Sequence, residues 1–282
     1  MTEPFGARPP GLVDSAVIAA TSRLPNNWLG LRIAIGLRRI VTMRMAANGG
    51  LDVERWGLRM RLHPRDNGCE KGALFTPQMY EAPERAELAA EIDKAAASGR
   101  TFVFVDVGAN VGLFSLFVAS RAGARAKILA IEPEPENLRR LRFNVAANPG
   151  IPIRVIPLAV DESAGKVALE TNLRDRGGTR TQPSRQHHQT GTAEVECLPL
   201  QDLLKREGLS YIDALKIDVE GAEDRILASF FRDTAQSLWP RLILIEDSRD
   251  SWRLDLFSLL AQCGYVVSAN TKQNAILRLP AK

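Results

Sequence analysis

Acidic side chains follow three apolar runs of this sequence, at positions where ligands bind in α/β proteins. Asp106 follows FVFV, Glu132 follows KILAI and Asp218 follows ALKI. Because the carboxyl ends of parallel strands share one edge of a sheet, we expect these carboxylates to lie at the same rim. A carboxylate at the end of the second strand is suited to accept hydrogen bonds from both hydroxyls of a ribose. The pattern therefore favours a nucleotide cofactor whose ribose carries no 2′-phosphate.

The turn after the first run is rich in glycine. Gly108, Asn110 and Gly112 lie between the strand and a short apolar helix in FVFVDVGANVGLFS. Glycine lets the backbone approach a ligand closely, and the free N–H groups at a helix start are hydrogen-bond donors. The dinucleotide fingerprint G-x-G-x-x-G fits poorly, because its second and third positions, counted from Gly108, fall on Asn110 and Leu113. The phosphate loop G-x-x-x-x-G-K-[ST] is absent from the sequence.

Further acids follow the third run. Glu220 and Glu223 begin the next expected helix, where acids also suit the helix dipole. Glu246 follows another apolar run, LILI. A hydroxyl acceptor in a group-transfer reaction benefits from a base. The candidate bases are Asp218, Glu220, Glu246 and the pair His187-His188.

A metal site could be assembled from Asp218, Glu246 and one histidine. The spacing of these residues is not diagnostic of a metal, and no set of zinc ligands occurs in the sequence. We therefore predict that the protein holds no metal.

Strands and helices alternate along most of the chain. The expected strands are 102–105, 127–131, 153–157, 166–170, 194–198, 214–217 and 242–245, and the expected helices are 84–98, 113–119, 135–147, 200–207, 222–231 and 252–263. A hairpin of 265–268 with 275–279 ends the chain. This alternation predicts an α/β fold with a mostly parallel sheet, a C-terminal antiparallel hairpin and helices on both faces.

The first part of the chain differs from the rest in charge. Residues 1–65 contain ten arginines and four acids, a net charge of +6, whereas the remaining 27 basic and 29 acidic residues give −2. We predict an N-terminal extension over 1–68 and a main domain over 69–282. The extension is expected to contain a disordered start over 1–10, helices over 13–21 and 28–45, and a small hairpin over 52–62.

The segment 28–45, WLGLRIAIGLRRIVTMRM, is apolar but contains four arginines. These charges make it a poor membrane span, and it lacks the cleavage pattern of a secretory signal. We expect an amphipathic helix that packs on its own domain. The alternative is an arginine-rich helix that lies on an acidic membrane surface or on a partner. Three widely spaced cysteines without a CxxC pair favour a cytoplasmic protein, with the inner face of a membrane as its alternative location.

The pattern D-x-G-x-N-x-G resembles motif I of the class I S-adenosylmethionine (SAM)-dependent methyltransferases. Four longer segments, FVDVGANVGLFS, AIEPEPENLRRLRFNV, PLAVDESAGKVAL and DALKIDVEGAEDRIL, follow one another in the order typical of the FkbM family of these enzymes. The segments LPLQDLLKREGLS and LILIED also fit. The chain therefore resembles FkbM methyltransferases over roughly residues 70–268.

The resemblance implies a Rossmann-like sheet and a set of SAM-binding residues. The methionine part of SAM would be held by Asp106, Gly108, Asn110 and Gly112, with Ala109 among them; the ribose by Glu132; and the adenosine near Pro133, Asn137 and Ala159. Asp218 and Glu220 would face the methyl group or the acceptor. The resemblance also implies O-methylation of a sugar or natural-product hydroxyl.

The polar segment 171–192, TNLRDRGGTRTQPSRQHHQTGT, is expected to be a lid or a disordered loop. As a lid, it would use Arg174, Arg176 and Arg180 to attract an acidic or sugar-like acceptor. We expect a small-molecule or saccharide acceptor and no nucleic acid, because no basic stripe with interleaved aromatic residues occurs. The oligomeric state is not predicted.

Two other functions remain open at this point. A nicotinamide-dependent oxidoreductase would share the sheet, but it needs the missing third glycine and a catalytic group such as Tyr-x-x-x-Lys, which does not occur. A non-catalytic SAM-fold module, acting at a membrane surface or in a complex, is supported by the basic N-terminal helix alone.

Overall fold

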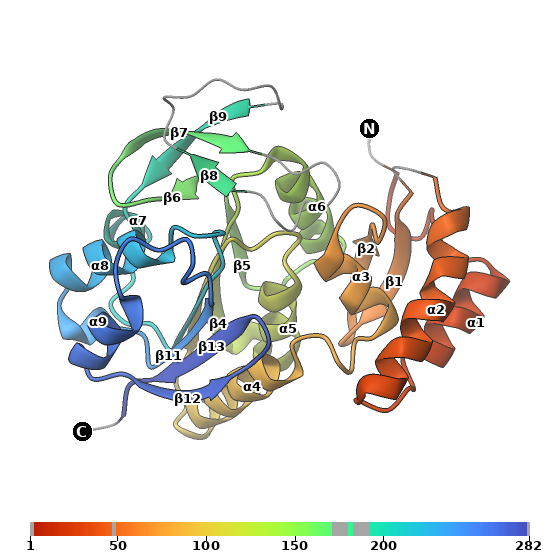
Figure 1. Cartoon of the computed structure of the whole chain (residues 1–282), viewed down its shortest axis with the longest axis horizontal. Helices are drawn as coiled ribbons and strands as arrows, with labels where there is room; N and C mark the ends of the chain where they lie inside the picture. The colour runs from red at the N-terminus through yellow and green to blue at the C-terminus, as the bar shows by residue number, and fades with distance from the viewer. Residues whose placement is uncertain (1–2, 47–48, 171–179, 183–191, 281–282) are drawn as a thin grey trace.

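A seven-stranded sheet lies at the centre of the structure, a computed structural model that describes residues 3–46, 49–170, 180–182 and 192–280 (Figure 1). Its strands are β3 (Phe102–Val107), β4 (Ala126–Ile131), β5 (Ile153–Ile156), β10 (Ala214–Ile217), β11 (Leu242–Glu246), β12 (Val266–Asn270) and β13 (Asn274–Arg278). They are ordered β12-β13-β11-β10-β3-β4-β5. All neighbours pair in parallel except β13, which runs antiparallel to β11 and β12. The predicted α/β fold with a C-terminal hairpin is confirmed.

Helices cover both faces of this sheet because side chains of each strand alternate between the faces. The helices are α4 (Ala82–Ala97), α5 (Leu113–Ala122) and α6 (Pro135–Ala146) on one face and α7 (Leu200–Arg206), α8 (Glu223–Asp233) and α9 (Leu256–Gln262) on the other. In β3, Phe102 and Phe104 pack with α4 and α5, whereas Val105 and Val107 pack with α7 to α9. Asp106 therefore shares the face of Phe104 and ends beneath the start of α5.

A smaller sheet lies beside the carboxyl ends of the central strands (Figure 1). It contains β6 (Ala159–Val160), β7 (Gly165–Glu170), β8 (Arg180–Gln182) and β9 (Thr192–Leu198), in the order β6-β9-β7-β8. The strands at 166–170 and 194–198 were predicted, but their separation into a second sheet was not. Most of the predicted lid, including Arg174, Arg176 and the pair His187-His188, lies outside the described residues.

The N-terminal region forms a core of its own against α5. It contains α1 (Leu12–Thr21), α2 (Trp28–Arg44), β1 (Leu51–Arg55), β2 (Leu58–Leu62) and α3 (Gly68–Phe75), of which α3 was not predicted. Met60 and Phe75 are fully buried in one cluster with Leu116 of α5. The two residues between β1 and β2, Trp56 and Gly57, have φ values of 51° and 78°, which tight hairpin turns require.

Residues 3–10 do not match the disordered start predicted from their composition. The carboxylate of Asp52 accepts hydrogen bonds from the backbone N–H groups of Gly6 and Arg8 at 2.8 and 3.0 Å. The guanidinium of Arg61 donates to the carbonyl oxygens of Glu3 and Pro4. Asp52 lies in β1 and Arg61 in β2, more than 40 residues further along the chain, so the composition of residues 3–10 could not indicate these contacts.

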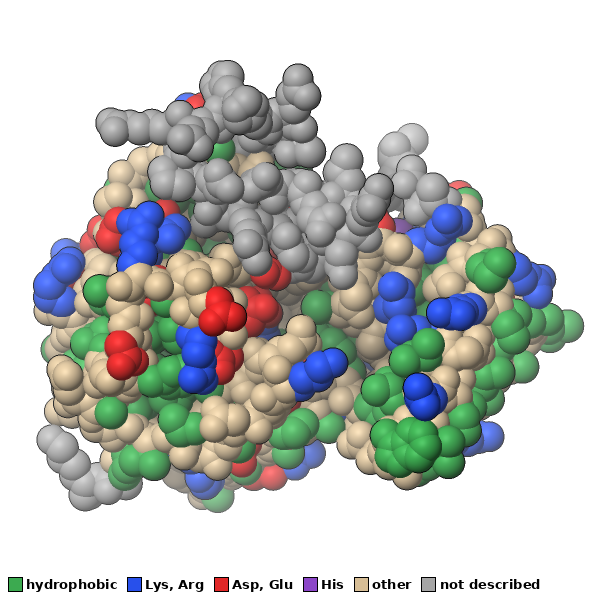
Figure 2. All heavy atoms as spheres, viewed as in Figure 1, with side chains coloured by type: hydrophobic (Ala, Val, Ile, Leu, Met, Phe, Trp, Pro, Cys, Tyr) green, Lys and Arg blue, Asp and Glu red, His purple; other side chains and the backbone are tan. Residues whose placement is uncertain are grey.

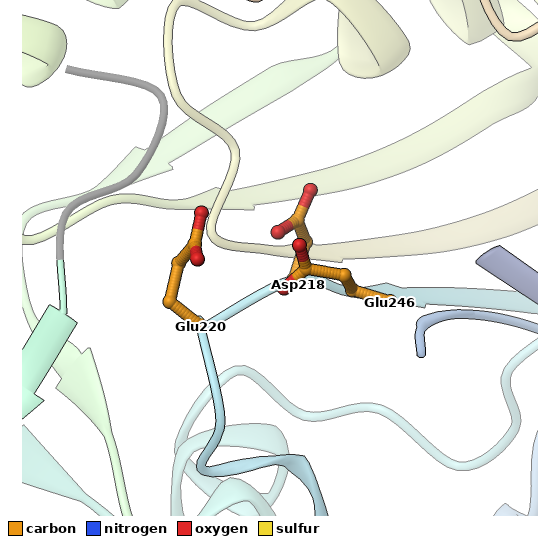
Figure 3. A group of neighbouring side chains, drawn as sticks. All are labelled: Asp218, Glu220 and Glu246. Carbon is orange, nitrogen blue, oxygen red and sulfur yellow. The ribbon is translucent and has the colours of Figure 1, made fainter. Parts of the chain in front are cut away.

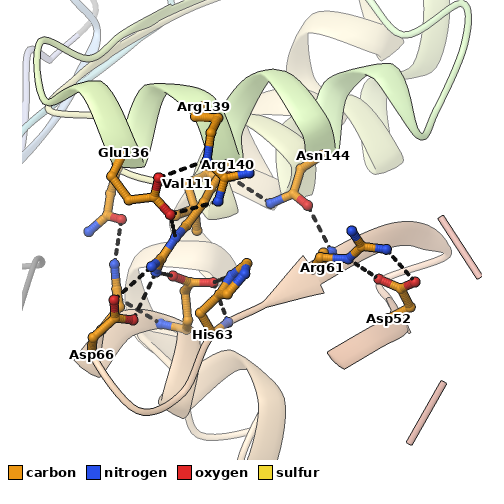
Figure 4. A network of polar contacts seen from close by, with 12 residues as sticks. Asp52, Arg61, His63, Asp66, Val111, Glu136, Arg139, Arg140 and Asn144 are labelled. Atoms are coloured by element: carbon orange, nitrogen blue, oxygen red, sulfur yellow. Dashed lines mark hydrogen bonds and ion pairs between the residues drawn. The ribbon is translucent and has the colours of Figure 1, made fainter. Parts of the chain in front are cut away.

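A buried polar network joins the N-terminal region to α6 (Figure 4). The guanidinium of Arg140 donates to the carboxylates of Asp66 and Glu70, at 2.7 and 2.6 Å. The side chain of Glu70 is fully buried, so this ion pair is shielded from solvent. One turn further along α6, Asn144 accepts the backbone N–H of Arg61 at 2.8 Å. The domain boundary predicted after residue 68 falls between Asp66 and Glu70, which both pair with Arg140. The predicted N-terminal extension and main domain therefore share a buried interface.

Candidate functional site

A cleft lies at the carboxyl ends of β3, β4 and β10, the edge at which doubly wound sheets bind ligands. The strand order reverses between β3 and β10, and the cleft lies at this switch point. The residues that line it are Cys69, Tyr80, Asp106, Gly108, Ala109, Asn110, Leu113, Phe114, Glu132, Pro133, Asn137, Leu169, Lys216, Asp218, Val219 and Glu220. The N-terminal region, the central sheet and, through Leu169, the small sheet all contribute.

The turn after β3 closely approaches the backbone that follows β10. Gly108 has a φ of 78°, and a Cβ atom there would lie 1.9 Å from the carbonyl oxygen of Asp218. Only glycine fits between these two strand ends. Asn110 has a φ of 53°, a left-handed conformation that asparagine adopts more readily than most residues. Gly112, with a φ of 86°, caps the start of α5, and a Cβ atom there would clash with Leu141; it does not line the cleft.

Asp106 has one paired and one unpaired oxygen at the cleft wall. Its Oδ2 accepts hydrogen bonds from the hydroxyl and the backbone N–H of Ser115, at 2.6 and 3.2 Å. Its Oδ1 is buried and has no hydrogen-bond partner within the part of the chain that the structure describes. Burial raises the pKa of this carboxyl, although the ammonium of Lys216 opposes the shift. A buried oxygen of this kind fits a ligand that brings a cationic donor.

Glu132 lies across the cleft at the end of β4. It is buried, and its two oxygens accept the backbone N–H groups of Asn110 at 2.7 Å and of Glu134 at 2.9 Å. Burial raises the pKa of this carboxyl to about 8, even though both hydrogen bonds favour the ionised form. Each oxygen keeps a second lone pair. The group can therefore still accept two hydroxyl donors, such as those of a ribose.

A buried lysine in the cleft was absent from the sequence prediction. Lys216 is in register with Asp106 on the neighbouring strand, and its ammonium lies 2.7 Å from a carboxylate oxygen of Asp218. The ammonium also lies 5.1 Å from the centre of the Phe114 ring. Burial alone would lower the pKa of Lys216, but the carboxylates of Asp218, Glu81 and Asp106 raise it well above its usual value. Lys216 is therefore a permanent cation and not a base.

Three carboxylates gather next to this lysine (Figure 3). Asp218 and Glu220 come from the loop after β10, and Glu246 comes from the end of β11. One carboxylate oxygen of each lies within 4.8 Å of one oxygen of the other two. Burial, and then the charges of Asp218 and Glu220, raise the pKa of Glu246 to about 8. Close carboxylates cannot all ionise without cost, so the group retains a proton near neutral pH or attracts a cation. That no metal binds here stays a prediction.

Glu223 supports this group from below without lining the cleft. Its fully buried carboxylate accepts the backbone N–H groups of Val219 and Gly221 at 2.9 and 3.0 Å. It also accepts the indole N–H of Trp252 at 2.9 Å. These bonds fix the loop that carries Glu220, whose φ of 59° is unusual for a residue other than glycine. Of the two acids predicted at this helix start, Glu223 therefore holds the loop in place and Glu220 lines the cleft.

Nine of the twelve residues predicted for the site line the cleft. The exceptions are Gly112, Ala159 and Glu246. Glu246 joins the site through the carboxylate group, whereas Ala159 is buried in β6, where it pairs with Cys197. Lys216 could have been found from LKID, because a residue two before Asp218 in a strand lies on the same face. Cys69 and Tyr80 have no such signal, since only the tertiary fold brings them to the strand ends.

Known proteins resemble this chain, and one family model spans all the residues that line the cleft except Cys69 and Tyr80. Residues 106–267 match the family model described as the methyltransferase FkbM domain. The methyltransferase sdnD of Sordaria araneosa is 29% identical, over 55% of this chain and 79% of that protein. The 31-O-demethyl-FK506 methyltransferase FkbM of Streptomyces tacrolimicus is also 29% identical, over 50% of this chain and 62%, less than two thirds, of that protein. A solved structure of a human methyltransferase 10 domain containing protein matches 89% of this chain and 97% of that chain, with 12% identity and a TM-score of 0.44.

Replacement of Gly108 by alanine tests the close approach of the two strand ends. The new methyl group would lie 1.9 Å from a backbone oxygen, at a positive φ. Gly99→Ala is the matched control, because Gly99 also has a positive φ, 67°, but nothing within 4 Å of the Cβ position. We expect Gly108→Ala to lower the free energy of unfolding by about 3 kcal/mol or more, and Gly99→Ala by about 1 kcal/mol, in urea denaturation. Equal losses would contradict the close approach.

Proposed function

The chain belongs to the FkbM family of methyltransferases, and on this premise we propose that it transfers a methyl group from SAM to a hydroxyl oxygen of a sugar or natural product. Methyltransferase activity follows from the family. The cofactor, the acceptor class and the roles of individual residues are our proposal. The observation that supports this proposal most is the charge of the cleft.

The cleft is acidic. Asp106, Glu132, Asp218 and Glu220 line it, and Lys216 is the one cation among its described lining residues. SAM carries a sulfonium and an ammonium group against one carboxylate, so its net positive charge is attracted to such a site. The pyrophosphate of a nicotinamide dinucleotide would instead meet the oxygen atoms of four acids and a single cation, Lys216, among the described lining residues, which disfavours its binding. The charge therefore supports SAM over the dinucleotide that the same type of sheet binds in other proteins.

The residues of the turn and of the second strand fit the parts of SAM. The unpaired Oδ1 of Asp106 would accept a hydrogen bond from the ammonium group, and Glu132 would accept the two ribose hydroxyls. Gly108 keeps the turn free of a side chain, so that the backbone can lie against the ligand. Pro133 and Asn137 border the same end of the cleft and would frame the adenosine. When bound, SAM supplies a methyl group that its sulfonium already activates.

An oxygen acceptor is supported by two observations. The name of the Streptomyces relative, 31-O-demethyl-FK506 methyltransferase, denotes a substrate that lacks a methyl group on an oxygen. A hydroxyl also loses a proton when it is methylated, and the three carboxylates at the cleft include a group that can receive it. Glu246, with a pKa of about 8, is poised to exchange a proton near neutral pH, next to Asp218 and Glu220. Lys216 neutralises part of the negative charge that collects there.

Removal of the Glu132 carboxylate tests the ribose assignment. We expect Glu132→Ala to weaken the binding of SAM and of its product S-adenosylhomocysteine by at least about tenfold, the scale of one lost charged hydrogen bond, in titration calorimetry. Glu162→Ala removes an exposed acid outside the cleft and should leave the affinity unchanged. NAD should bind to none of these proteins. Unchanged SAM binding by a folded Glu132→Ala protein would remove Glu132 from the cofactor site.

The rate of methyl transfer should rise with pH. Glu246 acts as a base only after it loses its proton, so the rate should increase about tenfold per pH unit below its pKa of about 8 and level off above it. With SAM at saturation, where the titration of Glu132 no longer affects the rate, Glu246→Gln should abolish this inflection, and Asp218→Asn should lower the rate by about 100-fold or more. The measurement is S-adenosylhomocysteine formation with a panel of hydroxylated sugars and natural products. A flat pH profile, or an inflection that persists in Glu246→Gln, would contradict the assignment of Glu246 as the base. Full turnover in Asp218→Asn would remove Asp218 from the catalytic group.

A further inference from the structure

Large apolar side chains gather on the surface of the N-terminal helices. Of the eleven large hydrophobic residues that are exposed in the described part of the chain, eight lie on α1 and α2. The six on α2 are Trp28, Leu29, Leu31, Ile33, Ile40 and Met43. Trp28 is 70% exposed and Met43 81%. Figure 2 shows this region, at the right of the view, as green hydrophobic side chains with blue basic ones among them.

Helix α2 packs on the protein through Gly30, Ala34, Leu37 and Val41 and leaves six large apolar residues exposed. Ala34 and Val41, seven residues apart, are fully buried. Ile33 directly precedes Ala34, and Ile40 directly precedes Val41. Both isoleucines are exposed and form a stripe with Leu29, which lies one helical turn before Ile33. A helix that only packed on its own domain would bury its larger side chains. Packing on its own domain, as expected from the sequence, therefore explains the buried face of α2. It does not explain why the exposed face carries large apolar side chains.

Arginines accompany the exposed stripe, and acids are absent from this part of the sequence. From Ser15 to Leu51 the chain contains five arginines and no aspartate or glutamate. Arg32 and Arg39 are both exposed, and the guanidinium of Arg32 lies 5.9 Å from the centre of the Trp28 ring. Aliphatic side chains together with tryptophan and arginine are the composition of helices that lie in the interface of an anionic membrane.

We infer that the exposed face of α2 binds the surface of an anionic lipid membrane. The helix lies parallel to the surface, its aliphatic stripe enters the headgroup boundary, and its arginines pair with lipid phosphates. No helix among the described residues is long and apolar enough to cross a membrane, so the contact is peripheral in this region. A second copy of the chain fits this face less well, because a symmetric contact would bring the arginines of both copies together.

Vesicle flotation of the full chain tests this inference. The protein should float with phosphatidylcholine vesicles that contain about one third phosphatidylglycerol, and much less with phosphatidylcholine alone. Leu29→Ser/Ile33→Ser/Ile40→Ser should lower the partition coefficient at least about tenfold through loss of apolar contact. Arg32→Gln/Arg39→Gln/Arg44→Gln should lower it about 100-fold and remove most of its salt dependence.

The matched control removes exposed apolar residues elsewhere. Leu254→Ser/Val266→Ser/Val267→Ser changes the remaining three exposed large hydrophobic residues of the described chain and should float like the unchanged protein. Circular dichroism and SAM binding should be unchanged in every variant, since none of these residues lines the cleft. Absence of flotation with anionic vesicles, or equal flotation of both serine triples, would overturn the inference. So would a dimer in sedimentation that the α2 triple alone dissociates, or binding to polyglutamate without binding to vesicles.

Discussion

The ammonium of Lys216 constrains the ligand edge of the sheet. A buried charge is stable only where opposite charges compensate it. The register of β10 with β3 supplies Asp106, the chain supplies Asp218 two residues later, and the segment before α4 supplies Glu81. Burial, and after it the charges of neighbouring acids, raise the pKa of several carboxyls around the cleft, and these acids outnumber the one lysine. The burial of one lysine therefore gathers acidic side chains at this edge, the feature on which the proposed binding of a cationic cofactor rests.

The geometry of the cleft depends on contacts between segments that are far apart in sequence. The turn at Gly108 can lie against the backbone of Asp218 only because no side chain separates them. The N-terminal region completes the wall with Cys69 and Tyr80, and the ion pairs of Arg140 hold that region in place. One side of this region therefore contributes to the cleft, and α2 presents an apolar, basic surface away from it.

The local features of the site were predictable from the sequence, and the long-range ones were not. The run that ends at Asp106, its glycine turn and the acid at Glu132 follow from strand and turn patterns within a few residues, and the structure places them around one cleft. Lys216 was missed although it lies two residues before Asp218, a spacing that places both side chains on one face of a strand, because a single lysine in an apolar strand was not read as a site residue. The start of the chain was wrongly predicted to be disordered, since the side chains that bind it, Asp52 and Arg61, lie in a distant hairpin.

A crystal structure of the complex with S-adenosylhomocysteine tests the central claim most directly, because it shows how the acidic cleft holds the cofactor. We expect both ribose hydroxyls to donate hydrogen bonds to Glu132 and the ammonium group to donate to Oδ1 of Asp106, with the sulfur facing Asp218. A nucleoside bound away from Glu132, or a ligand that leaves Oδ1 of Asp106 unpaired, would contradict this account of the cleft.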